Sequence, residues 1–343
     1  MESEDSSKTR PSVTFILFSF NQEEYIREAV EGAFRQDYQP MDIVLSDDCS
    51  TDSTFEIMKK MADAYEGPHN VTVVRNPANM GSFAHIVARG REAVSDIVVV
   101  AAGDDISVPQ RTSRIVDAFT EEAGCVFSRV SIIDEQGNVV AAAADRPLHL
   151  GVLRLFLHHP DSSNSAKAIQ GCSAAYRQWV FDFPLEPRNG SYPEDFFFNH
   201  YLLMIDADII RLDEPLVAYR THSRAISNYP VSNPVEYEVK AFGWAQVVRD
   251  MRDDLEKLAT EIGCLPVLDL DRLDDELLPT RDSADWPDLS FSQRLGRVGA
   301  ALSGGVKKSN RQRLIWGVVR LWGRYPNYQP KMFLSRFQKR FRS

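Results

Sequence analysis

The fold is decided by the stretch from Val13 to Asp52, which reads VTFILFSFNQEEYIREAVEGAFRQDYQPMDIVLSDDCSTD. Val13 to Phe18 and Asp42 to Leu45 are short, continuously apolar runs, which is typical of strands covered on both faces. Between them, apolar residues recur on one helical stripe, at Ile26, Val30, Ala33 and Phe34. Asn21, with Glu24 three residues later, predicts a capping box at the start of this helix. We therefore expect a strand, a helix and a second strand.

The same alternation continues to about residue 105. Val71 to Val74 and Ile97 to Ala101 are two more apolar runs. The helical stripes beside them consist of Phe55, Met58, Met61, Ala62 and Tyr65, and then of Phe83, Ile86, Val87 and Val94. Strands that alternate strictly with helices predict a parallel sheet with right-handed crossovers. In such a sheet, ligands bind at the carboxyl ends of the strands.

Beyond Asp105 the pattern changes. We expect Cys125 to Ile133 and Val139 to Ala143 to form a hairpin around the turn at residues 134–138. Helices are expected at residues 110–122, 151–158, 177–181, 193–205 and 235–262, with a short strand at Leu216 to Arg220. The second half of the fold is therefore predicted to mix hairpins and helices.

Composition narrows the class of protein. The chain has 343 residues, 39 Lys or Arg against 49 Asp or Glu, a net charge of −10 and 43% hydrophobic residues. This composition excludes the collagen-like and wholly disordered classes of protein. The apolar stretches are too short to cross a bilayer, which excludes a membrane-spanning protein. Its four cysteines are far apart and form no Cys-x-x-Cys pair, which favours reduced cytoplasmic thiols. The polar segment up to Arg10 matches neither a signal peptide nor a transit peptide.

The first of three acidic clusters, SDDCSTD at residues 46–52, directly follows the second predicted strand. Its carboxylates can accept hydrogen bonds from a base N–H or from ribose hydroxyls, which favours nucleotide binding. Ser50, Thr51 and Asp52 can instead cap the following helix. The alternative, that all of these are only loop and cap residues, explains Asp47 poorly.

The second cluster, AAGDD at residues 101–105, ends the fourth strand, and the third, YPED at residues 192–195, stands at an expected helix start. Two adjacent carboxylates after small residues suit a hard divalent cation that bridges diphosphate oxygens. A solvated turn is the alternative for the second cluster. Pro and acidic residues at a helix start are favoured for structural reasons alone, so the third cluster by itself indicates little.

In this order and spacing, the clusters resemble glycosyltransferase family 2, an inverting group with the GT-A fold. The resemblance runs from about Ser12 to Ser227 and is carried by VTFILFSFN (13–21), LSDDCSTD (45–52), NMG (79–81), GDDI (103–106) with Pro109, ED (194–195) and PLVAYRTH (215–222). It implies an α/β fold, namely a GT-A, Rossmann-like mixed sheet flanked by helices, with a helical C-terminal extension.

The resemblance also implies roles in donor binding. Asp47 matches the aspartate that reads the nucleotide base, and the further nucleotide-binding positions are Ser19, Asn21, Asp48 and Asp104. Asp104 matches the metal-binding aspartate of the family's Asp-x-Asp motif, with Asp105 beside it. Ala102 replaces the first aspartate of that motif, a departure from the family pattern, and metal dependence is still expected.

Further positions concern the transfer step. Asp195 matches the catalytic base of the Glu-Asp motif, and the neighbouring Glu194 can tune it or contact acceptor hydroxyls. Arg220 and His222 match a late Tyr-Arg-x-His element near the diphosphate, which makes His222 a possible metal ligand and Arg220 a possible contact of the diphosphate or acceptor.

The expected function is therefore inverting transfer of a sugar from a nucleotide-sugar donor to a hydroxyl of a glycan or lipid-linked acceptor. A divalent cation, Mn²⁺ or Mg²⁺, would neutralise the leaving diphosphate, and a base would take the proton of the attacking hydroxyl. No covalent enzyme intermediate is required. The alternative is a nucleotide-sugar-binding protein without transferase activity, motivated by Ala102.

Charge is divided unevenly along the chain. Residues 289–343 contain 13 Lys or Arg and no Asp or Glu, which leaves a net charge of −23 on residues 1–288. We expect a disordered segment at 1–10, the GT-A catalytic domain at 11–230, a helical extension at 231–265, an acidic linker at 266–288 and a basic amphipathic segment at 289–343.

Two apolar stripes in the basic segment, at 314–322 and 333–341, are flanked by Lys and Arg. This pattern suits a helix lying on an anionic membrane surface, which would place the protein at the cytoplasmic face. A helical subdomain that packs on the acidic body is the alternative. Nucleic-acid binding is disfavoured, because the charge of −23 would repel phosphates.

Overall fold

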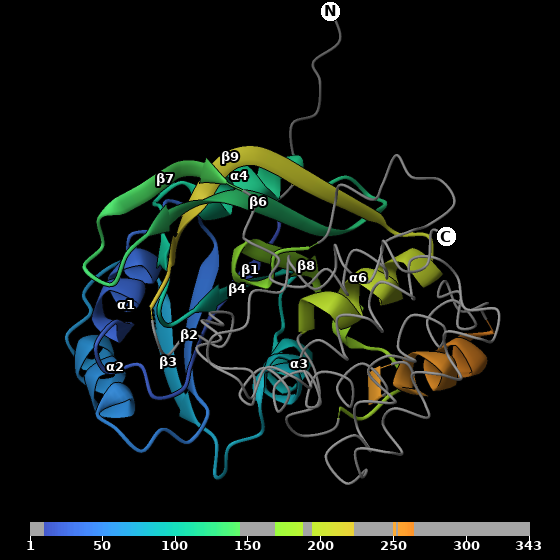
Figure 1. Ribbon diagram of the computed structural model, residues 1–343, viewed down its shortest axis with the longest axis horizontal. Coiled ribbons are helices and arrows are strands. Elements are labelled where there is room, and N and C mark those ends of the chain that lie inside the picture. The colour runs from blue at the N-terminus through green and yellow to red at the C-terminus, as the bar shows by residue number, and fades with distance from the viewer. Residues whose placement is uncertain (1–9, 145–168, 188–193, 223–249, 252, 264–343) are drawn as a thin grey trace, which may run out of the picture. The chain divides into compact units, whose positions relative to one another are not determined.

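Four parallel strands and three helices form the first half of the described chain. The computed structural model describes residues 10–144, 169–187, 194–222, 250–251 and 253–263. The elements are β1 (Val13–Ser19), α1 (Ile26–Phe34), β2 (Met41–Asp47), α2 (Thr54–Asp63), β3 (Asn70–Arg75), α3 (Ser82–Glu92) and β4 (Ile97–Ala102). β1 lies between β2 and β4, and β3 pairs with β2, all in parallel (Figure 1). The predicted parallel sheet is therefore confirmed.

The second half extends this sheet with strands of mixed direction. Its elements are β5 (Ile106–Ser107), α4 (Arg111–Ala118), β6 (Ala123–Ile133), β7 (Val139–Ala144), the 3-10 helix η1 (Gly171–Ser173), β8 (Ala174–Arg177), the 3-10 helix η2 (Gln178–Phe181), α6 (Glu194–Met204) and β9 (Asp208–Arg220). The strand order among the described residues is β3-β2-β1-β4-β8-β6-β9-β5, and β7 pairs with β6 as the predicted hairpin. β8 is antiparallel to β4, and β6 is parallel to β9.

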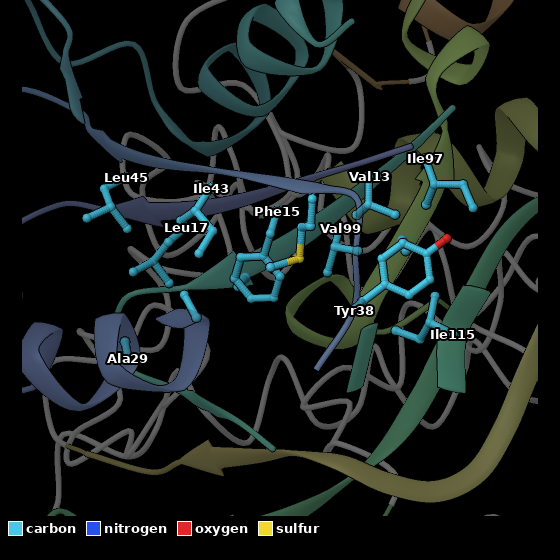
Figure 2. Close-up of a cluster of buried hydrophobic side chains, with 14 of the residues drawn as sticks. Val13, Phe15, Leu17, Ala29, Tyr38, Ile43, Leu45, Ile97, Val99 and Ile115 are labelled. Atoms are coloured by element: carbon cyan, nitrogen blue, oxygen red, sulfur yellow. The ribbon is translucent and has the colours of Figure 1, made fainter. Parts of the chain in front are cut away.

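The main core lies between the parallel strands and α1. Val13, Phe15 and Leu17 of β1 pack among residues of β2, β4 and α1, which include Ile43, Leu45, Val99 and Ala29 (Figure 2). Each of these side chains is at most 3% exposed. Burying a large apolar side chain stabilises the fold by roughly 1.5–3 kcal/mol. This core therefore fixes α1 against the strands whose ends carry the site.

A second core consists of aromatic rings around α6. Ring centroids lie 4.8 Å apart for Phe83 of α3 and Phe197 of α6, and 5.3 Å apart for Phe181 of η2 and Phe198 of α6. All four side chains are at most 1% exposed. Aromatic pairs at such spacings contribute about 0.5–1.5 kcal/mol beyond their buried area. This aromatic cluster holds α6, and with it Asp195 in its first turn, against α3 and η2.

The start of α1 differs from the prediction. The capping box at Asn21 and Glu24 is wrong, because α1 begins at Ile26 and its N-cap residue, Tyr25, makes no side-chain cap bond. Asn21 instead accepts the Thr51 N–H on Oδ1 at 2.8 Å. Its φ of 52° is one that Asn adopts more readily than most residues. Asn21 therefore joins two loops rather than capping a helix.

Several boundaries also differ. The predicted place of Val94 on a buried stripe is wrong, because α3 ends at Glu92 and Val94 is 99% exposed, whereas Phe83, Ile86 and Val87 are buried as predicted. α4 is shorter than the predicted helix at 110–122, and β9 is longer than the predicted strand. The helix expected at 177–181 is the short 3-10 helix η2, and Arg177 belongs to β8. β8 was not predicted, because a four-residue strand is too short to show a distinct apolar period.

Other predictions lie outside the described residues. These are the segments at 1–9, 151–158, 266–288 and 289–343 and most of the helix expected at 235–262. Residues 253–262 are helical, and Leu255, Leu258 and Ala259 are buried there. In the part of the chain that the structure describes, no helix combines the length and apolar character needed to span a membrane.

Candidate active site

The register of the parallel strands brings the predicted donor-binding segments to one edge of the sheet. Ser19, the last residue of β1, pairs with Asp47, the last residue of β2. Phe18 pairs with Ala102, which ends β4 two residues before Asp104. The three loops that follow these strands therefore begin side by side at the carboxyl edge, where a parallel sheet binds its ligands.

Asp47 is fully buried at this edge, and one of its two carboxylate oxygens accepts no hydrogen bond from the described residues. Its Oδ2 accepts the Ser50 N–H at 2.9 Å and lies 3.4 Å from Arg75 Nε. Its Oδ1 is buried and has no hydrogen-bond partner among the described residues. A buried acceptor without a partner costs roughly 1–3 kcal/mol, so a donor group supplied by a ligand would be favoured there.

The neighbouring Asp48 shapes a loop. It accepts hydrogen bonds from Asn76 Nδ2 at 2.8 Å and from the N–H groups of Met80 and Gly81, both at 2.9 Å. Gly81 has φ 80°, which favours glycine. Asp48 therefore ties the loop at residues 76–81 to the end of β2.

Ser19 and Asn21 also bond within the protein. Ser19 Oγ donates to Ser46 O at 3.3 Å, and its side chain is buried. The Asn21 N–H donates to Ser50 Oγ at 2.9 Å, in addition to the bond that its side chain accepts from Thr51. Both residues are at the predicted edge, where they join the loops after β1 and β2.

Asp104 and His222 form a pair of possible metal ligands. Asp104 Oδ2 and His222 Nε2 are 3.0 Å apart, and their side chains are 18% and 5% exposed. Asp105 points elsewhere, because its Oδ1 accepts the Arg220 N–H at 2.9 Å. The predicted pair of adjacent carboxylates therefore divides into one that faces a histidine and one that binds the β9 backbone.

The residues present fit a divalent cation that is completed by substrate and water. Within the described ranges, no group of three or more His, Cys, Asp or Glu side chains could hold a metal ion. Asp104 and His222 supply one carboxylate and one imidazole, and Mg²⁺ in particular is commonly bound by one or two protein ligands plus substrate phosphates and water. Because residue 102 is an alanine, it supplies no carboxylate, which agrees with a site where the protein provides only two ligands.

Arg220 is buried, and most of the N–H groups of its guanidinium donate hydrogen bonds within the protein. Its side chain is 1% exposed, and Nε donates to Asp104 O at 3.0 Å. Nη1 donates to the carbonyl oxygens of Asp134 and Glu135 at 3.3 and 3.1 Å, and Nη2 donates to Glu28 Oε2 at 2.7 Å. A direct contact with a diphosphate stays a prediction, since at most one N–H remains without a partner among the described residues.

Asp195 and Glu194 occupy the first turn of α6. Asp195 is 5% exposed, and its Oδ2 accepts the Gly171 N–H at 3.3 Å. A Cβ atom at Gly171 would lie 2.2 Å from Glu194 Oε1 and 3.4 Å from Asp195 Cβ. Both acidic side chains therefore depend on a glycine that precedes them by more than twenty residues, and no sequence signal marked it.

Arg111 was also missed by the sequence analysis. Its guanidinium is fully buried and donates to Val100 O at 2.6 Å and to Ser107 Oγ at 2.9 Å. Burial lowers the pKa of Arg111 to about 10, which leaves it protonated at neutral pH. Arg111 thereby joins β4 to β5 below the Asp104 turn. A basic residue on the same helical face as buried Ile115 was the available signal.

His85 joins α3 to the end of β2. It is 2% exposed, and its Nε2 lies 2.6 Å from Ser46 Oγ. Burial is the main reason that the pKa of His85 is lowered to about 4, against which nearby Asp48 acts to raise it. The ring is therefore neutral at pH 7 and serves as a polar link between α3 and the end of β2, inside the predicted donor-binding half.

The mixed sheet with its flanking helices is a GT-A fold. The chain is similar to the solved structure of mannosyltransferase PcManGT from Pyrobaculum calidifontis in complex with GDP-Man and Mn²⁺, with a TM-score of 0.51. The likeness covers 93% of this chain and 89% of that one at 19% identity, which shows the fold alone. Residues 14–180 match the family model described as Glycosyl transferase family 2. This match, over just under half of the chain, confirms the resemblance to glycosyltransferase family 2 that the sequence predicted.

Curated relatives cover parts of the chain. Uncharacterized protein Rv1520 of Mycobacterium tuberculosis is 28% identical over 247 residues, which are 70% of this chain and 68% of the relative. The undecaprenyl-phosphate 4-deoxy-4-formamido-L-arabinose transferase of Pectobacterium carotovorum is 30% identical over 173 residues, 49% of this chain and 50% of the relative. EpsE of Bacillus subtilis is 31% identical over 112 residues. The chain spans only 39% of EpsE's length.

Proposed function

We propose that the chain transfers a sugar from a nucleotide-sugar donor to a hydroxyl of a glycan or lipid-linked acceptor, with inversion at the anomeric carbon. The observation that carries this proposal is the pairing of Asp104 with His222, 3.0 Å apart, at the same sheet edge as the available oxygen of Asp47. A family 2 match over residues 14–180 supports it.

The donor half has two tasks in this proposal. Asp47 Oδ1 accepts an N–H of the nucleotide base, which would satisfy its buried lone pairs. Asp104 and His222 hold Mn²⁺ or Mg²⁺, while Asp105 keeps the turn in place through its bond to the Arg220 N–H. Held by Asp104 and His222, such a cation would supply positive charge beside the leaving diphosphate.

The acceptor half supplies the base. Asp195 takes the proton of the acceptor hydroxyl as that oxygen attacks the anomeric carbon from the side opposite the diphosphate. The Gly171 N–H, 3.3 Å from Oδ2, orients the carboxylate. Glu194 lies next to the base and contacts acceptor hydroxyls. A single displacement of this kind inverts the anomeric centre and needs no covalent intermediate.

The acceptor class is supported by one relative and by the basic segment. The Pectobacterium relative is named as an undecaprenyl-phosphate sugar transferase, and it is 30% identical to this chain over 173 residues. Residues 289–343 carry 13 Lys or Arg and no acidic residue, which suits an anionic membrane surface at the cytoplasmic face. Cell-surface polysaccharide or glycolipid synthesis follows as the proposed process.

The test is a two-stage assay on the full chain. Thermal stabilisation by UDP, GDP, dTDP and CDP sugars, each with Mn²⁺, Mg²⁺ or EDTA, identifies the donor, because a ligand bound at 100 times its Kd stabilises the folded state by about 2.7 kcal/mol. Mass spectrometry then follows transfer from that donor to polyprenyl-phosphate and oligosaccharide acceptors. Donor binding without transfer to either class would favour the alternative, a nucleotide-sugar-binding protein, whereas absence of donor binding would contradict both.

Membrane association is tested separately. Sedimentation with vesicles of phosphatidylglycerol and phosphatidylcholine should recover the full chain, and a variant that ends at residue 288 should remain in the supernatant. Phosphatidylcholine vesicles alone are the control, because they lack the anionic headgroups. If the full chain ignores anionic vesicles, the peripheral location is wrong, and the alternative of packing on the acidic body gains support.

A further inference from the structure

Arg220 connects three separate segments from the end of β9. Its Nε bonds the Asp104 carbonyl oxygen, its Nη1 bonds two carbonyl oxygens of the β6–β7 turn, and its Nη2 forms an ion pair with Glu28 of α1. Glu28 is 52% exposed, whereas the Arg220 side chain is 1% exposed. The guanidinium is therefore a buried junction beneath the Asp104 turn.

The end of β9 also holds both carboxylates of that turn. The Arg220 backbone N–H bonds Asp105 Oδ1 at 2.9 Å, and His222 Nε2 lies 3.0 Å from Asp104 Oδ2. The ring of Tyr25 lies 4.9 Å from the Arg220 Cζ and 4.7 Å from the His222 ring centroid. Arg220 and His222 are thus fixed against the same aromatic ring, and the position of one constrains the other.

We propose that Arg220 is a positioning residue for the metal-binding pair: by bonding the Asp104 carbonyl oxygen and packing on Tyr25, it holds the Asp104 carboxylate facing His222. The inference rests on the proposed function, because it assigns Arg220 a task toward the metal that Asp104 and His222 would bind. A guanidinium suits this task, since its planar fork reaches acceptors in several directions at once. The single ammonium of a lysine cannot bridge them all.

The sign of the expected effect separates positioning from simple charge. A cation as close to Asp104 as Arg220 disfavours Mn²⁺ by Coulomb repulsion, so a purely electrostatic role predicts tighter Mn²⁺ binding when the charge is removed. Positioning predicts weaker binding, because the Asp104 carbonyl loses its anchor. Arg220→Lys keeps the charge and removes the fork, so electrostatics predicts no change and positioning predicts a loss.

The experiment measures Mn²⁺ affinity of the full chain by electron paramagnetic resonance of free Mn²⁺. It uses Mn²⁺ alone and Mn²⁺ with UDP or GDP, for the unaltered chain, Arg220→Lys and Arg220→Met. We expect each variant to bind Mn²⁺ about 10-fold more weakly, the lower end of losses seen when residues that orient metal ligands are replaced. Arg91→Lys is the matched control, because the Arg91 guanidinium also bonds several carbonyl oxygens and a glutamate, those of Phe181, Phe183, Leu185 and Glu186, away from the Asp104 turn. It should bind Mn²⁺ normally.

Circular dichroism at the assay temperature establishes that each variant is folded. The proposal is overturned if folded Arg220→Lys binds Mn²⁺ like the unaltered chain, or if Arg220→Met binds it more tightly. It is also overturned if Arg91→Lys loses as much affinity, or if Arg220→Lys fails to fold while Arg91→Lys folds, since the role would then be structural. Absence of Mn²⁺ binding by the unaltered chain would instead contradict the proposed metal site itself.

Discussion

The turn at Asp104 and the start of α6 each present one carboxylate, but they hold it by different means. Asp104 lies in a turn that is fixed by hydrogen bonds, with Arg220 on its carbonyl and His222 on its carboxylate. Asp195 lies on a helix that is fixed by aromatic packing, and its carboxylate accepts the Gly171 N–H. One position depends on polar partners and the other on shape.

The Asp104 turn and the start of α6 should therefore respond differently to substitutions. Hydrogen bonds are directional, so the Asp104 turn should tolerate changes of volume nearby better than the loss of a donor. Close packing transmits small steric changes, so the start of α6 should be sensitive to a single added methyl group.

Asp195→Asn should cause the largest loss. Without a base, the acceptor hydroxyl must attack with its proton in place, and we expect transfer to fall by about 10³-fold, within the range for general bases. Initial rates with the identified donor and acceptor measure this. Glu194→Gln is the control and should cost no more than about 10-fold, since it keeps the base; an equal loss would place the base at Glu194.

Asp104→Asn should lower transfer by about 100-fold and raise the Mn²⁺ concentration needed for half-maximal rate. The amide keeps the shape of the side chain but removes the charge that attracts a divalent cation. Asp105→Asn should do less, because an amide oxygen can still accept the Arg220 N–H. Metal titrations of the rate distinguish the two, and a larger effect at Asp105 would exchange their roles.

The polar links of the donor half should also make stability depend on pH. The pKa of His85 is about 4 in the folded protein and about 6.5 when unfolded, so only the unfolded state gains a proton between these values. Its contribution is complete above pH 6.5 and is lost as pH falls toward 4, on the order of 2 kcal/mol. Urea unfolding from pH 7 to pH 4.5 measures this loss. His85→Gln cannot titrate there, so parallel stability curves for the two proteins would refute the assignment.

Gly171→Ala should have the smallest effect, about a 10-fold fall in transfer with unchanged nucleotide binding. The added Cβ atom would lie 2.2 Å from Glu194 Oε1, so the Glu194 carboxylate must move from its place beside Asp195. A double-mutant cycle with Glu194→Ala tests the cause, because removing that carboxylate makes room for the methyl group. Additive losses in the double variant would show that Gly171 acts by another route.

The donor half could largely be predicted from sequence because its signals are local. Apolar runs gave the parallel strands, and the strand ends carried Asp47 and Asp104, whose edge the register confirms. Asp48 shows the limit of that reasoning, since its bonds to Asn76, Met80 and Gly81 depend on a loop that approaches from outside the strand.

The acceptor half could be predicted less well because its contacts join residues far apart. The Glu-Asp pair was located from its motif and its helix start, but Gly171 and the rings of Phe83 and Phe181 reach α6 only through the tertiary fold. Arg111 and Arg220 are the largest fully buried side chains among the described residues. Their charge alone would predict that they lie at the surface. Their burial depends on carbonyl oxygens that no residue pattern reveals.

The separate roles of Asp104 and Asp195 are tested by calorimetry of one nucleoside diphosphate. Its binding is measured for the unaltered chain, Asp104→Asn and Asp195→Asn. With Mn²⁺ present, we expect Asp195→Asn to bind the nucleotide within two-fold of the unaltered chain and Asp104→Asn to bind it at least 10-fold more weakly. EDTA should weaken the unaltered chain to the level of Asp104→Asn. Equal binding by Asp104→Asn and the unaltered chain, or a greater loss in Asp195→Asn, would contradict the assignment of metal binding to Asp104 and of the base to Asp195.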